Sequence, residues 1–163
     1  MEKNEKEIWK IKMATDRHFS YQWKMFSTYK DLGYNNIEEV KQALLQKTNT
    51  TPDDWKGRKC FDAGCGIGLF TLAALELGAE SVTAVDIARG AVEVCKINTR
   101  GKPVKVYVCD ITDIPEDDES FDAVFSVNCL HHVPEIDVAI RELARITKKG
   151  GWVAFNIAVK RPA

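Results

Sequence analysis

Glycine recurs at every second position in one short stretch of the chain, Asp62-Ala63-Gly64-Cys65-Gly66-Ile67-Gly68. Residues 58–63 indicate a strand, and apolar residues recur at helical spacing over 69–77, so the stretch is expected to turn from strand into helix. Glycine permits backbone angles that a Cβ forbids, and it lets a ligand approach the main chain. The free N–H groups of a first helical turn favour an anionic group. We therefore expect a binding loop here.

The number of glycines decides between two nucleotide cofactors. A dinucleotide-binding loop has the spacing G-x-G-x-x-G, and Leu69 stands where its third glycine would be. This disfavours a nicotinamide-dependent dehydrogenase. The spacing D-x-G-x-G-x-G, which runs from Asp62 to Gly68, instead resembles motif I of the class I S-adenosylmethionine-dependent methyltransferases.

The composition excludes other classes of protein. The 163 residues are 45% apolar and 29% charged, as in an ordinary globular domain. A formal charge of −1 gives no basic excess, so neither nucleic acid nor a membrane is an expected partner. No apolar run approaches the ~20 residues of a membrane span, and residues 1–7 are charged where a signal peptide is apolar. We expect a cytoplasmic protein.

The cysteines indicate neither disulfides nor a metal site. There are five, at positions 60, 65, 95, 109 and 129, and no two have the C-x-x-C spacing. Most fall in expected strands or helices, which is typical of reduced, buried thiols in a cytosolic protein. No bound metal is expected.

From residue 58 onward, expected strands and helices alternate. The strands are expected at about 58–63, 81–86, 104–110, 121–128 and 152–159. The helices are expected at about 68–77, 89–100 and 134–147, and Gly150-Gly151 is expected to end the last of them. Such alternation predicts an α/β fold with a doubly wound parallel sheet, covered by helices on both faces.

Residues 1–57 form a separate N-terminal segment that is rich in aromatic residues set among charges. A helix is expected to begin after Asn36 and to continue to about Lys47. Asn36 is its expected N-cap, and Glu39 stands at the capping-box position. A turn or single helical turn over 50–54 is expected to lead into the first strand.

Polar residues stand at the ends of four expected strands: Asp62, Asp86, Asp110 and Asn128. The carboxyl ends of parallel strands meet at one edge of a doubly wound sheet, where ligands bind. Asp86 follows Asp62 by 24 positions (86 − 62), a spacing that suits an acid holding ribose hydroxyls. The alternative for each acid is a solvated strand end or a helix cap.

Taken in order, these four sites resemble the class I methyltransferases over residues 58–159. The continuation of the fourth strand, Asn128-Cys129-Leu130-His131-His132, resembles the small-molecule (type 11-like) branch. It does not resemble the N/D-P-P-Y/F/W signature of enzymes that methylate base or glutamine amines. The resemblance implies a Rossmann-like sheet of strand order 3-2-1-4-5. It also implies in-line transfer of the methyl group of S-adenosylmethionine to an O, N, C or S atom of a small molecule.

The resemblance also implies which residues bind the cofactor. Gly64, Gly66 and Gly68 would make room for the methionine part, and Asp62 would help to hold its ammonium. Asp86 would bind the ribose. The residues expected at the cofactor are Asp62, Gly64, Cys65, Gly66, Gly68, Asp86, Ile87, Asp110, Ile111, Asn128 and Tyr21.

Three of the remaining assignments rest on the same resemblance. The adenine amine would be bound by Asp110, and backbone groups at Asn128 would close over the methionine end. The segment 17–26, with its F-x-Y-Q-W core, resembles a pre-domain segment that could fold over the cofactor cleft. Its alternative is packing against the helices of the sheet.

No catalytic residue is assigned, but two histidines are candidates. His131 and His132 could position or deprotonate an acceptor, because imidazole titrates near neutral pH. The alternative is a histidine packed at a helix start beside the cofactor.

The expected domain, residues 58–163, departs from the family in lacking the last two of seven strands. The fifth strand would then be an edge that can pair with another chain. A truncated chain, a homodimer joined at this edge, or an N-terminal segment folded across it would each explain the departure. A non-catalytic module that binds the cofactor without an acceptor pocket is the alternative function.

Overall fold

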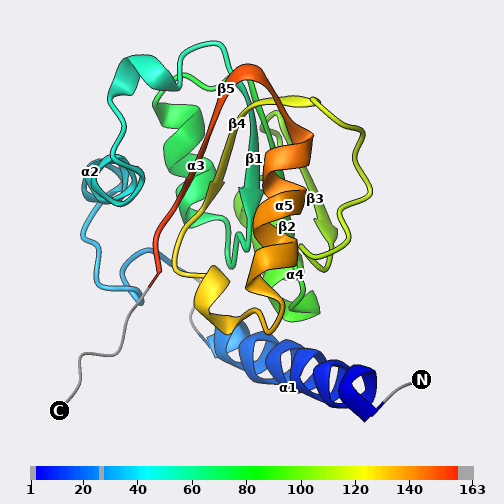
Figure 1. The fold of residues 1–163 in the computed structure, drawn as a ribbon. Helices are drawn as coiled ribbons and strands as arrows, with labels where there is room; N and C mark the ends of the chain where they lie inside the picture. Colours follow the sequence, from blue (N-terminus) through cyan, green and yellow to red (C-terminus); the bar gives the residue numbers. More distant parts are fainter. Residues whose placement is uncertain (1–2, 26–27, 158–163) are drawn as a thin grey trace, which may run out of the picture.

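The computed structural model describes residues 3–25 and 28–157, which form one parallel sheet with helices around it (Figure 1). The strand order is β3-β2-β1-β4-β5, and all four pairings are parallel. The strands are β1 (Lys59–Ala63), β2 (Ser81–Asp86), β3 (Val104–Val108), β4 (Phe121–Ser126) and β5 (Thr147–Phe155). This confirms the predicted fold. The strand order reverses between β1 and β4, which opens a crevice at their carboxyl ends.

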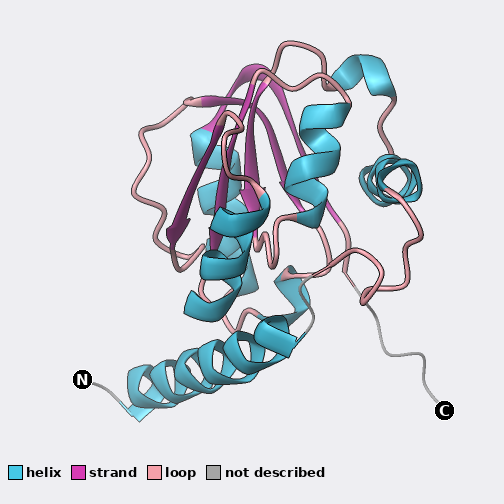
Figure 2. Cartoon of the chain, turned by 180° about the vertical axis from the view of Figure 1, so that it is seen from behind, coloured by secondary structure: helices cyan, strands magenta, loops and turns pink. Residues whose placement is uncertain are grey.

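Helices cover both faces of the sheet. Side chains alternate between the two faces along each strand, so each face carries apolar side chains that pack against helices. One core contains buried residues of α2 (Ile37–Thr48), α3 (Leu69–Glu76) and α4 (Arg89–Asn98). The other contains those of α5 (Ile136–Ile146) and of the loop after β3. Figure 2 shows the same layers from behind. Short 3-10 helices span Pro52–Asp54 and Leu130–His132.

The first helix, α1 (Lys3–Met25), was not predicted as a helix. It lies across the end of the sheet where the strands finish (Figures 1 and 2). It also completes α4, whose own N-cap residue, Ala88, makes no side-chain cap. The N–H groups of Arg89 and Gly90 donate to Asp16 Oδ1 (3.1 Å) and Ser20 Oγ (3.0 Å) of α1. Two otherwise unpaired N–H groups at the start of α4 thus hold α1 in place.

The start of α2 confirms its predicted N-cap but not its capping box. Asn36 Oδ1 accepts the N–H of Glu39 at 3.0 Å, as predicted. The Glu39 carboxylate does not return to Asn36, because it accepts the backbone N–H of Asn35 (2.9 Å) and its side-chain amide (3.0 Å). The predicted reciprocal pair is therefore wrong by one residue.

The predicted role of Gly150-Gly151 as the end of α5 is wrong, and so is the predicted start of β5 at residue 152. The helix ends at Ile146 and the strand begins at Thr147, so Gly150 and Gly151 lie inside β5. The β4–β5 register shifts opposite them, and Gly150 has φ +80°. A Cβ on Gly151 would lie 2.6 Å from the carbonyl oxygen of Asp122. The two glycines therefore allow an irregularity in β5 where it pairs with β4, and they do not end a helix.

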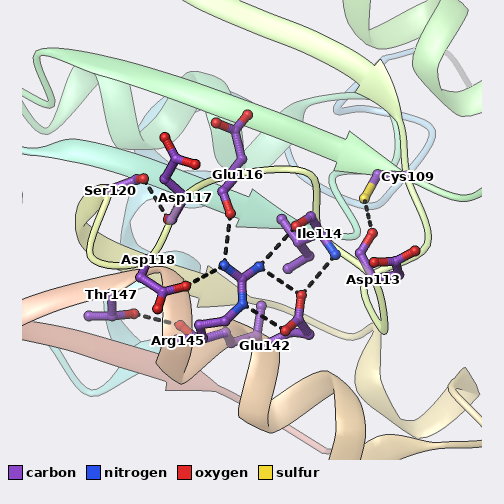
Figure 3. Close-up of polar contacts among 11 residues, drawn as sticks. Cys109, Asp113, Ile114, Glu116, Asp117, Asp118, Ser120, Glu142, Arg145 and Thr147 are labelled. Carbon is purple, nitrogen blue, oxygen red and sulfur yellow. Dashed lines mark hydrogen bonds and ion pairs between the residues drawn. The ribbon is translucent and has the colours of Figure 1, made fainter.

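One side chain of α5 fastens the long loop between β3 and β4 (Figure 3). The Arg145 guanidinium donates to the carbonyl oxygens of Ile114 (2.9 Å) and Glu116 (2.8 Å) and to Asp118 Oδ1 (2.8 Å). It also forms a two-point contact with Glu142, at 2.7 and 2.8 Å. The loop begins at the expected adenine residue, so Arg145 fixes the backbone that leads away from that position.

We predict that Arg145→Met lowers the free energy of unfolding by about 1.5–3 kcal/mol, the scale of hydrogen bonds to a charged group. The loss follows because two loop carbonyls lose the guanidinium as a donor and the Glu142 carboxylate loses its cationic partner at the same time. Urea unfolding measures it. Arg141→Met is the matched control, because Arg141 forms only an exposed pair with Asp137, which is worth ~0–1 kcal/mol. Equal losses in the two variants would contradict this role of Arg145.

Candidate cofactor site

A cavity of about 260 Å³ lies at the carboxyl ends of the strands, with α1 forming one of its walls. Its lining comes from α1, the turn at 32–34, the glycine loop, the start of α3, the ends of β2 and β3, and residues 127–134. The predicted residues that line it are Gly64, Cys65, Gly66, Asp86, Ile87, Asp110, Ile111, Asn128 and His132. The fold thus brings together residues that lie far apart in the sequence.

At each of the three loop glycines, a Cβ would meet a different part of the protein. All have positive φ: +86° at Gly64, +52° at Gly66 and +84° at Gly68. A Cβ on Gly64 would overlap Cys129, and one on Gly68 would lie 2.6 Å from Cys95 Sγ. A Cβ on Gly66 would lie 3.4 Å from the ring of Trp23, which lines the cavity as Cys129 does. Gly68 lies outside the lining, so in this structure it makes room for a thiol of the protein.

The Asp86 carboxylate links the end of β2 to the glycine loop. One oxygen accepts the N–H of Gly66 at 2.9 Å and the other accepts the N–H of Ala88 at 2.8 Å. Burial raises the pKa of Asp86, and hydrogen bonds from the backbone N–H groups of Ala88, Gly66 and Ile87 act against the increase. Each oxygen keeps a lone pair. The carboxylate therefore has an acceptor position left on each oxygen for a ligand that reaches the cavity.

Asp110 is held from two sides. Its Oδ1 accepts the N–H (3.0 Å) and the hydroxyl (2.7 Å) of Thr112, and its Oδ2 pairs with Lys12 of α1 at 2.8 Å. Burial alone would raise the pKa of Asp110, but the bonds from Lys12 and Thr112 outweigh it and lower the pKa. The carboxylate is therefore held ionised.

Tyr21 is a correction to the predicted site. Its side chain is 73% exposed and does not line the cavity. The cavity is instead lined by Phe19 and Trp23, four positions apart on α1. Each helical residue turns the side-chain direction by about 100°, so a residue midway between these two points away from them. The aromatic motif marked the correct segment, but without a predicted helix the inward face was not identified.

Asp62 lies beneath the glycine loop and outside the cavity lining, with 2% of its surface exposed. The Thr71 hydroxyl donates to its Oδ2 at 2.6 Å. Burial raises the pKa of Asp62 to about 7, and the nearby charge of Asp86 adds to the increase. Its expected contact with a cofactor ammonium stays a prediction.

The segment after β4 presents a polar pair that the sequence reasoning missed. Asn128 has φ +55°, its N–H donates to Asn156 Oδ1 (2.8 Å), and Asn156 Nδ2 donates back to Asn128 Oδ1 (2.7 Å). Asn156 directly follows the end of β5. It was missed because the fifth strand was predicted to continue to residue 159, which would have made Asn156 an interior strand residue.

The two candidate histidines are placed differently. His132 lines the cavity, with its ring edge-to-face against Phe19 at a centroid distance of 5.0 Å. Partial burial lowers the pKa of His132, and the neighbouring His131 and His18 add to this. His131 is exposed and outside the lining. A neutral imidazole at the cavity can accept a proton.

Within 3–25 and 28–157, no group of three His, Cys, Asp or Glu side chains could hold a metal ion. None of the helices in these residues has the length and apolar character to cross a membrane. All five cysteines are free, and four of them are buried.

The lining suits a nucleoside joined to an amino acid. Asp86 offers acceptors for two hydroxyls, and Ile87 and Ile111 offer apolar surface beside Asp110. Gly66 presents bare backbone on the other side of Asp86. These residues fit the parts of S-adenosylmethionine.

The fold and this cavity define a Rossmann-like nucleotide-binding protein. Residues 61–155 match the family described as "Methyltransferase domain", and the match covers more than half of the chain. The chain therefore belongs to the methyltransferase domain family, which implies S-adenosylmethionine as the cofactor.

Two similar curated proteins are named as O-methyltransferases. The ubiquinone biosynthesis O-methyltransferase of Alkalilimnicola ehrlichii is 36% identical over 110 residues, which are 66% of this chain and 44% of that protein. The one of Pelagibacter ubique is 27% identical over 151 residues, 91% of this chain and 62% of the relative. The chain spans about half the length of the curated relatives that it matches.

Solved structures share the fold. The [4+2]-cyclase SpnF has a TM-score of 0.66 and 26% identity, over 77% of this chain and 46% of that chain. An S-adenosylmethionine-dependent methyltransferase from Mesorhizobium loti has a TM-score of 0.59 and 23% identity, over 74% of this chain and 53% of that chain. The second likeness concerns the fold alone.

We predict that Asp62 makes a contribution to stability that is present at about pH 4 and is lost as pH rises to about 7, because folding raises the pKa of Asp62 from 3.8 to about 7. In that window the folded state binds the Asp62 proton more tightly than the unfolded state, so the free energy of unfolding falls. Asp62→Asn keeps an acceptor for Thr71 and removes this fall. Relative to the unaltered chain, it should gain more than about 1 kcal/mol between pH 4 and pH 8.

Urea unfolding of the ligand-free chain at several pH values measures this difference. Asp117→Asn, at an exposed position, is the matched control. A difference between Asp62→Asn and the unaltered chain that stays constant with pH would refute the assignment of the proton to Asp62.

Proposed function

We propose that this chain binds S-adenosylmethionine in the cavity under α1 and belongs to an enzyme that transfers its methyl group to a small aromatic molecule. The observation that supports this most strongly is the convergence of Asp86, Asp110 and the bare backbone of Gly66 on one cavity. Family membership supports the same cofactor. When bound, S-adenosylmethionine supplies an electrophilic methyl group on sulfur.

The residues of the chain would act by binding and orienting. Asp86 would accept hydrogen bonds from the ribose hydroxyls, and Asp110 would accept one from the amine of the base. Ile87 and Ile111 would flank the base. Gly66 leaves room for the amino-acid part. Holding a nucleophile in line and at close approach supplies much of the rate in such a transfer, so no covalent catalyst is required.

The apolar part of the cavity lining supports an apolar, flat substrate. It includes aromatic and aliphatic side chains from three parts of the chain: Phe19, Trp23, Leu32, Tyr34 and Phe70. Aromatic side chains favour offset or edge-to-face contact with another ring. The names of the ubiquinone biosynthesis O-methyltransferases add support for an oxygen atom as the nucleophile.

Binding without transfer is the second candidate function. The fold alone cannot choose, because one scaffold can support several chemistries, and the similar SpnF is titled a cyclase. A radiolabelled methyl group that appears on an added acceptor distinguishes transfer from binding.

Several expectations stay predictions. These are the absence of a nucleic-acid partner, a cytoplasmic location, the division of the chain at residue 57, and a homodimer through β5. Among the described strands, β5 lies at one edge of the sheet with its outer side unpaired. Such an edge favours strand pairing with a second copy. Sedimentation of the purified chain measures the oligomeric state.

We predict that S-adenosylmethionine and S-adenosylhomocysteine both bind the purified chain and that NAD does not. Asp86→Asn should weaken S-adenosylhomocysteine by about 1–3 kcal/mol, since it removes a charged acceptor of the ribose hydroxyls. Isothermal titration calorimetry measures this. Asp117→Asn, an exposed aspartate of the 109–120 loop, should bind as the unaltered chain does. Unchanged affinity in folded Asp86→Asn would remove Asp86 from the site.

A second prediction concerns proton transfer from the acceptor. We propose that His132 accepts the proton of a phenolic acceptor, so His132→Ala should lower kcat by about 10²–10⁴-fold. His131→Ala is the matched control, because His131 lies outside the cavity lining. Transfer of labelled methyl to a panel of catechols measures kcat, and calorimetry confirms that S-adenosylhomocysteine still binds. Equal turnover in both variants would exclude His132 as the base.

A further inference from the structure

Lys12 of α1 lines the cavity, and each N–H donor of its ammonium group has an acceptor. Nζ lies 2.8 Å from Asp110 Oδ2, 2.8 Å from Glu135 Oε2 and 3.0 Å from Thr112 Oγ1. An ammonium has three N–H donors, so these three acceptors leave none for a ligand. The side chain is 17% exposed. Lys12 therefore acts on whatever the cavity binds through its neighbours.

The neighbour that matters most is Asp110. Its Oδ1 already accepts two hydrogen bonds from Thr112, and its Oδ2 accepts one from Lys12. A carboxylate has about four acceptor positions, two on each oxygen. One position is therefore left, on the oxygen that Lys12 holds. The direction of this last lone pair depends on Lys12.

We propose that Lys12 is a positioning residue that makes the cavity selective for a base carrying an exocyclic amine. This rests on the proposed function, in which Asp110 faces the base. A carboxylate that can only accept will bind the amine of adenine and repel the carbonyl oxygen that hypoxanthine carries at the same position. Lys12 keeps Asp110 in that state and aims its last acceptor position. Because Lys12 belongs to α1, the selectivity depends on a segment outside the sheet.

An opposite role for Lys12 has an opposite outcome. If Lys12 only occupied Asp110 in the empty site, a ligand would have to displace it, and its removal would strengthen binding. If Lys12 only anchored α1, its removal would weaken every ligand equally. Positioning alone predicts a change in the ratio between two ligands that differ at the base.

The test compares S-adenosylhomocysteine with S-inosylhomocysteine, in which the amine is replaced by a carbonyl, by calorimetry at pH 7. We expect the unaltered chain to prefer the adenine ligand. Lys12→Met should reduce this preference by about tenfold or more, chiefly by weakening the adenine ligand, since about 1.4 kcal/mol corresponds to tenfold. Lys12→Arg keeps a donor to both carboxylates and should restore most of the preference.

The matched control loosens α1 at its other contact. The double variant Asp16→Ala with Ser20→Ala removes the two acceptors that hold α1 to the start of α4. It leaves Lys12 and Asp110 in place. It should weaken both ligands by the same factor and leave their ratio unchanged. Circular dichroism confirms that each variant is folded.

The outcomes separate this proposal from the one on which it rests. Failure of the unaltered chain to bind S-adenosylhomocysteine would overturn the proposed function, and this inference with it. Normal binding by the unaltered chain, with an unchanged ligand ratio in folded Lys12→Met, would overturn only the role of Lys12. Tighter binding of S-adenosylhomocysteine by Lys12→Met would overturn it too, in favour of competition for Asp110.

Discussion

The cavity depends on the hydrogen bonds between the end of β2 and the glycine loop. Asp86 accepts the N–H of Gly66, and the carbonyl oxygen of Val85 accepts the N–H groups of Gly64 and Cys65. These bonds satisfy loop donors that a regular helix or strand would otherwise pair. They require the positive φ angles of the loop, which glycine adopts without a Cβ penalty. The same carboxylate therefore holds the loop open and faces the cavity.

The first helix converts the open crevice of the sheet into a walled cavity. Its two polar contacts lie at different elements: Asp16 and Ser20 at the start of α4, and Lys12 at Asp110 and Glu135. Aromatic side chains of α1 line the cavity. Polar contacts thus hold α1 both to the start of α4 and to the residues Asp110 and Glu135 beside the cavity. Residues of α1 cover part of the space above the glycine loop, and electrostatic interactions are stronger where less water surrounds them.

The sequence predicted the parts of the site that local rules determine. Strand ends and glycine spacing follow from backbone geometry, and Gly66, Asp86 and Asp110 all line the cavity. Their contacts with a cofactor stay predictions. The failures have tertiary causes. The sequence predicts no helix over α1, so it gives no reason to prefer Phe19 and Trp23 over the exposed Tyr21. Apolar residues continue past the end of β5, so the sequence does not mark Asn156 as the residue that follows the strand. No local pattern reveals which element a lysine of α1 will reach.

Three carboxyl groups meet at this end of the sheet, and the protein compensates each by a different means. Asp62 is buried and retains its proton up to about pH 7. The Asp86 carboxyl accepts hydrogen bonds from backbone N–H groups, and the Asp110 carboxylate pairs with a lysine. Full ionisation without compensation would cost stability, because like charges in a poorly solvated site repel. Of these three carboxyl groups, Asp86 and Asp110 line the cavity, beside the ammonium group of Lys12. Their acceptor oxygens favour a ligand with several hydrogen-bond donors.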